Sequence, residues 1–598
     1  MDLRNVAIVA HVDHGKTTLL DGLLRQTGSF RDNQHVEERA MDSGELERER
    51  GITIRAKNTS VEYKGVRIHL VDTPGHADFG GEVERVLGMV DSVLLLVDAV
   101  DGVMPQTRFV MRKALEHGAR PMLVVNKIDR HDQRAAEVLD EVFDLLVDLG
   151  ATDAQLDFPV VYASARQGVA SREIAGPFED LRPLLDMVLE HAPLPKVDRE
   201  GPFQFQAVTL GYDEYLGRLV IGKVERGTLV RGSMAARLPE EGPPEHFRVT
   251  KLFGSRGLQR VELDKAEAGE LVIIAGLDQI EIGDTIASPE RLERLPRIHI
   301  DPPTVRVRFS VNNSPFAGQE GRFVTSRQVG ERLEREVLGN VSIRMQPAET
   351  TDTFEVSARG ELQISVLIET MRREGYEFSV SRPEIIVREI DGKKCEPVED
   401  VVAEVPKAYA GIVMEKISSR KGRLLSMEQR GERTLQTFSV PSRGLVGYRS
   451  EFLSDTRGEG VLHRTVRGYE PYAGDLPRRG FGAMIASEGG RTTAHAIWGI
   501  QDRATMFITA GENVYEGQVV GENRRDNDLN VNVTRAKKLT NIRAAGKDEQ
   551  AILTPPRQIT IESALEWIED DELLEITPQN LRLRKRKLAA NQRKRRDM

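Results

Sequence analysis

The sequence contains little cysteine, few aromatic residues and no long apolar run. Cys395 is the only cysteine among 598 residues, which excludes an intrachain disulfide and a zinc site built from cysteines, and which fits a reducing compartment. The apolar run at residues 93–97 is far shorter than the roughly 20 residues of a membrane-spanning helix. Only five consecutive apolar residues follow Asn5, fewer than the roughly 7 to 15 of a signal-peptide core. We therefore expect a cytoplasmic protein without a membrane partner.

Charge is distributed unevenly along the chain. The formal charge of −10, taken alone, argues against a nucleic-acid partner, because phosphate contacts require Lys and Arg. Residues 581–598, however, contain nine basic residues and one Asp, a local charge of +8, so the other 580 residues carry −18. The pattern at residues 561–575 predicts an acidic helix ahead of this basic tail. The acidic total is therefore compatible with an RNA-rich partner.

The length and the apolar patterns predict a multidomain α/β protein with five domains. At roughly 150 residues per domain, 598 residues correspond to about four. Apolar runs that alternate with helical patterns in residues 1–198 predict a parallel sheet, and short strands broken by glycine predict a β-barrel at residues 199–300. Residues 301–390 and 391–477 each show the strand and helix order of a ferredoxin-like α+β fold. Residues 478–598 have a glycine-rich strand pattern, which we interpret as a mainly-β binding domain.

A phosphate-binding loop is predicted at residues 10–17, AHVDHGKT, between an expected strand and an expected helix. In such a loop consecutive backbone N–H groups face phosphate oxygens, Lys16 neutralises the β- and γ-phosphates, and the Thr17 hydroxyl binds Mg²⁺. Ala10 stands where the first glycine of the motif is usual. The loop is therefore interpreted together with the motifs that follow it.

A second motif, DTPGH at residues 72–76, follows the apolar strand pattern IHLV. Asp72 at a strand end can meet Mg²⁺ through a water molecule, and the N–H of Gly75 can face a γ-phosphate. An ordinary junction between a strand and a turn is the alternative interpretation, since Asp, Pro and Gly all favour turns.

Two further motifs indicate guanine recognition. Asn126-Lys127-Ile128-Asp129 follows a predicted strand, and the Asp129 carboxylate can accept hydrogen bonds from N1–H and the exocyclic amine of guanine, a donor pair that adenine lacks. The dipeptide Ser164-Ala165 can supply a backbone N–H to guanine O6, although a chance dipeptide is the alternative interpretation. The four motifs occur in the order found in P-loop GTPases, each after a predicted strand, so the sequence predicts a GTPase.

A switch loop is predicted between the first two motifs. Residues 50–54, RGITI, lie in a charged, loop-like region, and Thr53 can complete the coordination of Mg²⁺ only when a γ-phosphate is present.

The segments AHVDHGKTT, RGITI, VDTPGH and NKID resemble those of the translational GTPases, in which a GTP-binding domain leads into a β-barrel. The resemblance covers at least residues 3–390. It implies that His76 is the catalytic histidine beside the attacking water, and that Val12 and Ile52 form an apolar gate next to it. It also implies that Thr53 binds Mg²⁺. Together with the motifs, it gives these expected contacts to GTP or GDP: Asp13, His14, Gly15, Lys16, Thr17, Thr18, Gly75, Asn126, Lys127, Ile128, Asp129, Ser164 and Ala165. The expected Mg²⁺ ligands are Thr17, Thr53 and Asp72.

The C-terminal part resembles the BipA/TypA family most closely. Translocase-type elongation factors carry a further domain between their two ferredoxin-like domains, whereas here Glu389 leads directly into the second one. The segments VYEGQVVGENRRDNDLNVNVTRAKKLTNIRAAGKDE and TPPRQITIESALEWIEDDELLEITPQNLRLRKRKL carry the resemblance. A LepA-like or elongation-factor-like translation factor is the alternative, although the C-terminal domain of LepA has a different sequence.

The resemblance implies a ribosome-associated GTPase that converts GTP to GDP and phosphate, in large-subunit assembly or in translation regulation under stress. The implied partners are the ribosome and its subunits, rRNA and, as a further candidate, tRNA, and the chain is expected to be a monomer. The residues expected to bind RNA are Arg524, Arg525, Lys537, Lys538, Arg543, Lys547, Arg582, Arg584, Lys585, Arg586 and Lys587.

Three alternatives remain open from the sequence. A GTP-gated binding protein would use the same motifs, with hydrolysis only incidental. A signalling GTPase would act on proteins instead of on the ribosome. The basic tail can also be a solvated, disordered terminus that binds nothing.

Overall fold

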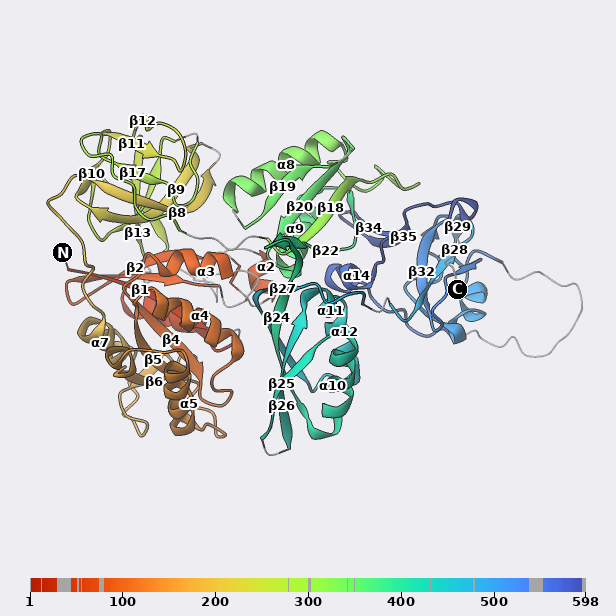
Figure 1. Ribbon diagram of the computed structural model, residues 1–598, viewed down its shortest axis with the longest axis horizontal. Helices are drawn as coiled ribbons and strands as arrows, with labels where there is room; N and C mark the ends of the chain where they lie inside the picture. Colours follow the sequence, from red (N-terminus) through yellow and green to blue (C-terminus); the bar gives the residue numbers. More distant parts are fainter. Residues whose placement is uncertain are drawn as a thin grey trace, which may run out of the picture. The chain divides into compact units, whose positions relative to one another are not determined.

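The computed structural model groups the chain into two compact units, which are coloured by sequence in Figure 1. The first covers residues 1–302 together with 336–342, and the second covers 303–335 and 343–598. The described residues are 2–11, 13–28, 45–50, 53–54, 56–74, 80–213, 215–277, 279–298, 303–340, 342–348, 350–430, 432–476, 479–536 and 552–593. The boundaries of the five domains stay a prediction.

A seven-stranded sheet in the order β2-β3-β1-β4-β5-β6-β7 forms the centre of the first domain. Strands β3, β1, β4, β5 and β6 pair in parallel, whereas the edge strands β2 and β7 run antiparallel to their neighbours. The predicted parallel sheet is therefore confirmed. The strand bounds are Asp2–Ala10 (β1), Lys57–Tyr63 (β2), Val66–Asp72 (β3), Ser92–Asp98 (β4), Arg120–Asn126 (β5), Val160–Ser164 (β6) and Val169–Ser171 (β7).

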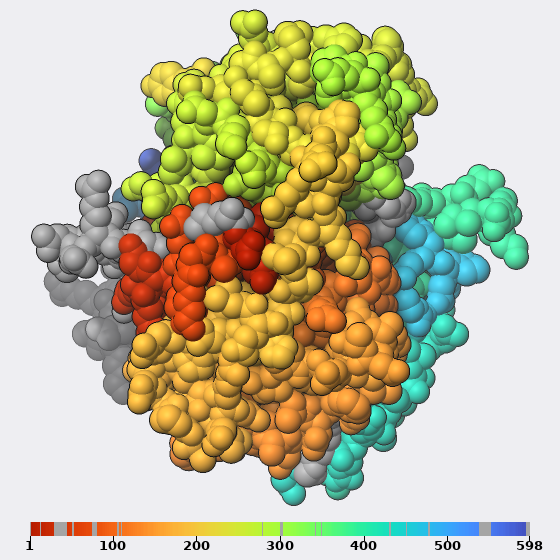
Figure 2. All heavy atoms as spheres, turned by 90° about the vertical axis from the view of Figure 1, so that its left-hand side faces the viewer, coloured from red at the N-terminus to blue at the C-terminus, as the bar shows by residue number. Residues whose placement is uncertain are grey.

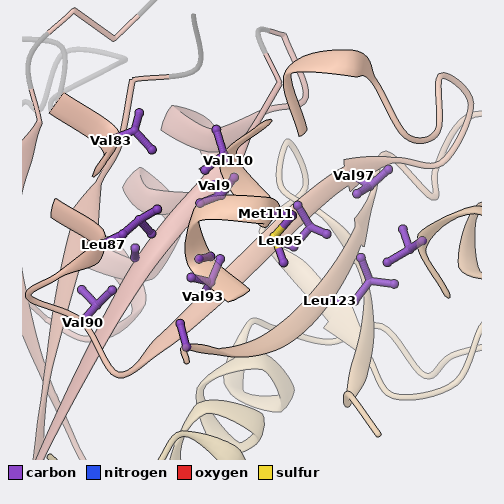
Figure 3. Packing of buried hydrophobic residues seen from close by; sticks show 14 of the residues in the cluster. Val9, Val83, Leu87, Val90, Val93, Leu95, Val97, Val110, Met111 and Leu123 are labelled. Atoms are coloured by element: carbon purple, nitrogen blue, oxygen red, sulfur yellow. The ribbon is translucent and has the colours of Figure 1, made fainter. Parts of the chain in front are cut away.

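Apolar clusters cover both faces of this sheet, which explains why its central strands read as continuous apolar runs. Val6 and Ile8 of β1 belong to one cluster, and Ala7 and Val9 belong to the other, because successive side chains of a strand point to opposite faces. Figure 3 shows the second cluster, in which residues of β1, β4 and β5 meet residues of α3 and α4. The helix bounds are Lys16–Gln26 (α1), Glu45–Arg50 (α2), Gly80–Leu87 (α3), Pro105–Glu116 (α4), Ala135–Asp148 (α5), Asp153–Leu156 (α6) and Arg182–His191 (α7).

The predicted β-barrel is confirmed in the second part of this unit. Eight antiparallel strands follow the order β12-β11-β17-β8-β9-β16-β13-β14, and β10 pairs with β15. The barrel contacts the first domain (Figure 2): the Thr59 hydroxyl donates to the Gly257 carbonyl at 2.6 Å, and the Gly257 N–H donates to the Ser60 carbonyl at 2.9 Å. The bounds are Gln204–Asp213 (β8), Gly217–Arg226 (β9), Thr228–Val230 (β10), Met234–Leu238 (β11), Glu245–Arg248 (β12), Lys251–Arg256 (β13), Gln259–Glu262 (β14), Lys265–Glu267 (β15), Leu271–Ala275 (β16) and Thr285–Ala287 (β17).

The second unit contains both predicted ferredoxin-like folds. The first has the antiparallel order β21-β18-β20-β19, and the second has the order β27-β24-β26-β25, so each is a split βαβ arrangement. The second helix of the second ferredoxin-like fold is divided into α11 and α12, because Gly447 adopts a left-handed φ of 74° before α12. The bounds are Val305–Val311 (β18), Ser326–Gly339 (α8), Arg344–Pro347 (β19), Thr353–Ala358 (β20), Glu361–Arg373 (α9), Phe378–Val380 (β21), Glu384–Ile385 (β22), Arg388–Ile390 (β23), Lys393–Pro406 (β24), Ala410–Ser419 (α10), Arg423–Arg430 (β25), Arg433–Pro441 (β26), Ser442–Leu445 (α11), Tyr448–Asp455 (α12) and Val461–Pro471 (β27).

The C-terminal region extends the sheet of the first ferredoxin-like fold. Strand β34 pairs with β21 and also with β35, which in turn pairs with β32, so that one eleven-stranded sheet results. The bounds are Gly482–Ala486 (β28), Gly490–Arg491 (β29), Ala494–Trp498 (α13), Ala504–Met506 (β30), Asn513–Val514 (β31), Gln518–Asn523 (β32), Leu529–Val531 (β33), Ile561–Trp567 (α14), Glu572–Ile576 (β34) and Leu581–Lys585 (β35).

The prediction of one acidic helix followed by a basic tail is wrong for part of this region. Helix α14 ends at Trp567, and the rest of the acidic stretch continues into β34. The first five residues of the expected tail form β35. Residues 572–576 and 581–585 place opposite charges across the ladder, with Glu572 facing Lys585 and Glu575 facing Arg582, and such cross-strand pairs stabilise a hairpin.

In the described part of the chain, no helix is both long enough and apolar enough to span a membrane.

A buried histidine makes the first domain sensitive to acid. His69 of β3 lies between β1 and β2 with 3% of its surface exposed, and neither ring nitrogen has a hydrogen-bond partner among the described residues. Burial, with a smaller contribution from Arg67, lowers the pKa of His69 from 6.5 to about 3. The unfolded chain therefore binds a proton below pH 6.5 that the folded chain does not bind.

We expect His69 to cost this domain no stability above pH 6.5 and up to about 1.4 kcal/mol per pH unit as the pH falls from 6.5 toward 3. His69→Leu should reduce this pH dependence. The measurement is hydrogen exchange of β1 and β3 amides in both proteins at matched pH values, because Trp498 and Trp567, the only tryptophans, lie in the other unit. An unchanged pH dependence in the variant would contradict the prediction.

Candidate nucleotide-binding site

The carboxyl ends of the parallel strands meet at one edge of the sheet. Asp72 ends β3, Asp98 ends β4, Asn126 ends β5 and Ser164 ends β6, while the predicted phosphate-binding loop follows β1. Ligands of open α/β sheets bind outside the carboxyl ends of the strands. The fold therefore brings motifs that are far apart in the sequence to one place.

Two described residues of the predicted phosphate-binding loop have a left-handed backbone conformation. Gly15 precedes α1 with a left-handed φ of 93°, and a Cβ atom there would lie 2.5 Å from the Asn126 Nδ2 atom. Asp13 is also left-handed, with φ of 66°. Left-handed residues in a tight loop turn successive N–H groups toward an anion, and the start of α1 adds the positive end of a helix dipole.

Asn126 joins three of the predicted motifs. Its Nδ2 donates to the His14 carbonyl at 2.8 Å, and its Oδ1 accepts from the Ala165 N–H at 2.9 Å. The Ile128 N–H donates to the Ala163 carbonyl at 3.2 Å and holds the two loops together. A single amide therefore fixes the phosphate-binding loop relative to the two segments expected to contact guanine.

Asp98 is a residue of this site that sequence reasoning missed. Its carboxylate pairs with Lys127 Nζ at 2.6 Å, and its N–H donates to Nδ1 of the buried His14 at 3.3 Å. Burial and the neighbouring His11 lower the pKa of His14 to about 3, which keeps its ring neutral. Although burial opposes it, hydrogen bonds from Lys127 and the Val100 N–H lower the pKa of Asp98. The sequence could have indicated Asp98 by its position at the end of the apolar run SVLLLVD, because a carboxylate at the end of an apolar run is also what indicated Asp72.

The side chains of Lys16, Thr53 and Asp72 converge at the end of β3. Lys16 Nζ lies 2.8 Å from Asp72 Oδ1 and also donates to the Thr73 carbonyl, while the Thr53 hydroxyl lies 3.4 Å from Asp72 Oδ2. Asp72 is fully buried, and Thr53 is 4% exposed. Carboxylate and hydroxyl oxygens are ligands that suit Mg²⁺. Thr53, Asp72 and the half-buried Thr17 of α1 therefore fit the expected ion.

The remaining predicted nucleotide contacts lie around this edge or outside the described residues. Thr18 and Asp129 are exposed, and Ile128 is half-buried against the apolar cluster shown in Figure 3. Four predicted residues lie outside the described part of the chain: Val12, Ile52, Gly75 and His76. Helix α2 ends at Arg50, the first residue of the predicted switch loop, and the other described residues of that loop, Thr53 and Ile54, lie outside helices and strands.

The structure separates the eleven predicted RNA-binding residues into three groups. Arg524, Arg525, Arg586 and Lys587 are exposed. Four others lie outside the described residues: Lys537, Lys538, Arg543 and Lys547.

The last three predicted RNA contacts are corrected by the structure. Arg582 pairs with Glu320 and with Glu575, Arg584 is 1% exposed, and Lys585 is 1% exposed beside Asp528, Asp571 and Glu572. The charges of Arg582 and Lys585 are directed to carboxylates inside the protein, and Arg584 donates to the side-chain oxygen of Asn313, so these residues stabilise the sheet instead of facing a phosphate backbone.

Four family models match consecutive parts of the chain. They are the Elongation factor Tu GTP binding domain at residues 1–194, Elongation factor Tu domain 2 at 217–287, the Elongation factor G C-terminus at 393–479 and the TypA/BipA C-terminal domain at 481–590. A crystal structure of a protein from Thermus thermophilus shares the fold, with a TM-score of 0.54, 19% identity and coverage of 79% of this chain and 97% of that one.

Curated relatives match over nearly their whole length. The chain is 51% identical to the large ribosomal subunit assembly factor BipA of Bacillus subtilis, over 99% of this chain and 97% of the relative. It is 50% identical to the protein of that name from Escherichia coli K12, over 99% and 98%. The identity to the Synechocystis protein of that name is also 50%, over 98% of each.

Gly15→Ala should lower the affinity for GDP by about tenfold to 100-fold, because backbone strain of roughly 1–3 kcal/mol adds to the contact with Asn126. Gly28→Ala is the matched control. Gly28 lies beyond the other end of α1 with φ of 69°, but nothing lies within 4 Å of a Cβ atom there. Titration calorimetry with GDP measures both, and an equal loss of affinity in the two variants would contradict the role of the Asn126 contact.

Proposed function

Since the chain belongs to the TypA/BipA family, we propose that it binds GTP, hydrolyses it to GDP and phosphate, and acts in assembly of the large ribosomal subunit. The relatives carry the name of a large ribosomal subunit assembly factor over almost the same length. The match of the TypA/BipA C-terminal domain at residues 481–590 favours this family over the LepA-like alternative. The observation that carries nucleotide binding is the Asn126 amide, which joins the phosphate-binding loop to the loop before Asp129.

The proposed reaction is in-line attack of water on the γ-phosphate. Lys16 neutralises charge on the β- and γ-phosphates, and the N–H groups of the loop before α1 bind their oxygens. Thr17, Thr53 and Asp72 would hold Mg²⁺, which supplies further positive charge to the phosphates. His76 positions the attacking water, and the Asp129 carboxylate selects guanine over adenine.

The ion pair between Lys16 and Asp72 supports this assignment. Both side chains are buried, with 9% and 0% of their side-chain surfaces exposed, so neither charge is compensated by bulk water. When a phosphate and a divalent cation bind together, Lys16 can pair with the phosphate and Asp72 can pair with the cation. Each buried charge then exchanges its present partner for a new one. The site is therefore suited to the metal-bound nucleotide more than to either component alone.

We expect purified ribosomes or large subunits to increase multiple-turnover GTP hydrolysis, because the relatives carry the name of a large ribosomal subunit assembly factor and a ribosomal surface is therefore the expected partner that positions His76. His76→Ala should remove most of this stimulation while leaving GTP affinity unchanged. If ribosomes left the rate unchanged, the ribosomal assignment would fail while GTP hydrolysis could still stand. Sedimentation with each subunit in GTP, GDP and a non-hydrolysable analogue then identifies the target.

The exposed basic residues of the C-terminal region are expected to contact rRNA. Arg524→Gln/Arg525→Gln and Arg586→Gln/Lys587→Gln should each lower the salt dependence of ribosome binding, by about 0.7 to 0.9 in the log–log slope for every phosphate that the variant no longer binds. Cosedimentation at several salt concentrations measures this slope, and an unchanged slope in both variants would place the RNA-binding surface elsewhere.

A buried lysine provides the control for these variants. Lys585→Gln should instead lower stability by about 3–5 kcal/mol, because Asp528, Asp571 and Glu572 would lose their shared partner. Urea unfolding followed by the fluorescence of Trp498 and Trp567, which lie in the same unit, reports this loss.

A further inference from the structure

Helix α2 buries a carboxylate in an otherwise charged and solvent-facing sequence, ELERER. Glu47 is 6% exposed, whereas Glu45 and Glu49 of the same helix are exposed. Burial of a carboxylate is costly unless the group is paired and hydrogen-bonded. The position of Glu47 therefore requires partners, and the structure provides them.

Both carboxylate oxygens of Glu47 bind the segment that leads into β2. Oε1 accepts a hydrogen bond from the Ile54 N–H at 3.0 Å, and Oε2 lies 2.5 Å from Lys57 Nζ. Glu47 thus contacts two residues that lie seven and ten positions later in the sequence. These contacts hold the segment before β2 against helix α2. Lys57 has 20% of its side chain exposed, so the ion pair is largely withdrawn from water.

The partners of Glu47 lie next to the candidate metal site. Lys57 is directly opposite Asp72 in the antiparallel ladder of β2 and β3, and Ile54 follows Thr53, whose hydroxyl lies 3.4 Å from Asp72 Oδ2. Ile54 and Lys57 both follow Thr53, so their contacts with Glu47 fix the chain on the C-terminal side of Thr53 and limit its movement away from Asp72.

We propose that Glu47 is a positioning residue that, through Ile54 and Lys57, holds the Thr53 hydroxyl beside Asp72 and thereby favours the triphosphate over the diphosphate. This inference rests on the proposed function, in which Mg²⁺ and GTP bind at this site. A threonine of this kind contacts the ion only when the γ-phosphate is present. Loss of the ion pair should therefore weaken binding of a GTP analogue with Mg²⁺ and leave GDP binding unchanged.

A purely structural role for Glu47 predicts a different result. If the ion pair only stabilised the domain, its loss would affect both nucleotides equally or neither of them. The ratio of the two affinities therefore distinguishes positioning from general stability, and it does not depend on hydrolysis.

The test uses the full chain with Glu47→Gln, which retains an acceptor for the Ile54 N–H but removes the charge, and with Lys57→Met, which removes the other partner. Glu49→Gln is the matched control from the exposed face of α2. Affinities for a non-hydrolysable GTP analogue and for GDP, each with Mg²⁺, are measured by titration calorimetry. We expect both variants to bind the GTP analogue about tenfold more weakly, with GDP affinity within about twofold of the parent, because each variant removes the ion pair that holds the segment after Thr53.

The double variant completes the test. Glu47→Gln/Lys57→Met should lose no more affinity for the GTP analogue than either single variant, since both remove one interaction. Equal losses for GTP analogue and GDP, unchanged affinities, or the same loss in Glu49→Gln would overturn the positioning role. Failure of the unmodified chain to bind the GTP analogue would instead refute the proposed function, so the two failures are distinguishable.

Discussion

The parallel register of β1 with β3 is the constraint on which the nucleotide site depends. Ile8 pairs with Asp72 in this register, so the end of β3 lies beside the loop that follows β1. A shift by one residue would turn the Asp72 side chain to the other face of the sheet and separate it from Lys16. The apolar clusters on both faces oppose such a shift, because every side chain of β1 would exchange one cluster for the other.

A comparable constraint acts in the second unit. The pairing of β21 with β34 joins the sheet of residues 303–390 to that of the C-terminal region, across the 391–477 segment that separates them in sequence. Buried charges reinforce the junction: the Asn312 amide donates to Glu377 at 2.8 Å and to Glu575 at 3.2 Å. The C-terminal region is therefore built into a neighbouring sheet and is not attached by a linker alone. Its exposed basic residues are consequently held on a rigid support.

Much of the first domain could be predicted because its signals are local. A strand, a loop of fixed length and a helix follow one another within about 25 residues, and the motifs after β3 and β5 repeat the same pattern. The ferredoxin-like folds were also accessible, since their strands and helices alternate with clear periodicity. Those features required no knowledge of which segments pair over long distances.

What could not be predicted depends on partners that are remote in sequence. The sequence predicts Arg582 to be part of a basic tail. Its partner Glu320, however, is 262 residues away in sequence, and the contact between them holds Arg582 against the folded protein. Glu47 lies in a segment that the sequence predicts to be a charged, loop-like region, and only the course of the chain after α2 shows that its side chain is buried. Charged residues belong to the surface by default, so composition alone assigns such residues wrongly whenever opposite charges are buried together.

The place of β35 in its sheet has a consequence for biosynthesis. It is the last strand of the described chain, yet it lies between β34 and β32 in the interior of the sheet. A ribosome makes the first unit, including β1 to β17, long before it makes this strand, so that unit can fold early. The large sheet of the second unit can close only after β35 has been made. An interrupted chain would therefore carry a complete nucleotide domain beside an open sheet with exposed edges, the form most prone to aggregation and proteolysis.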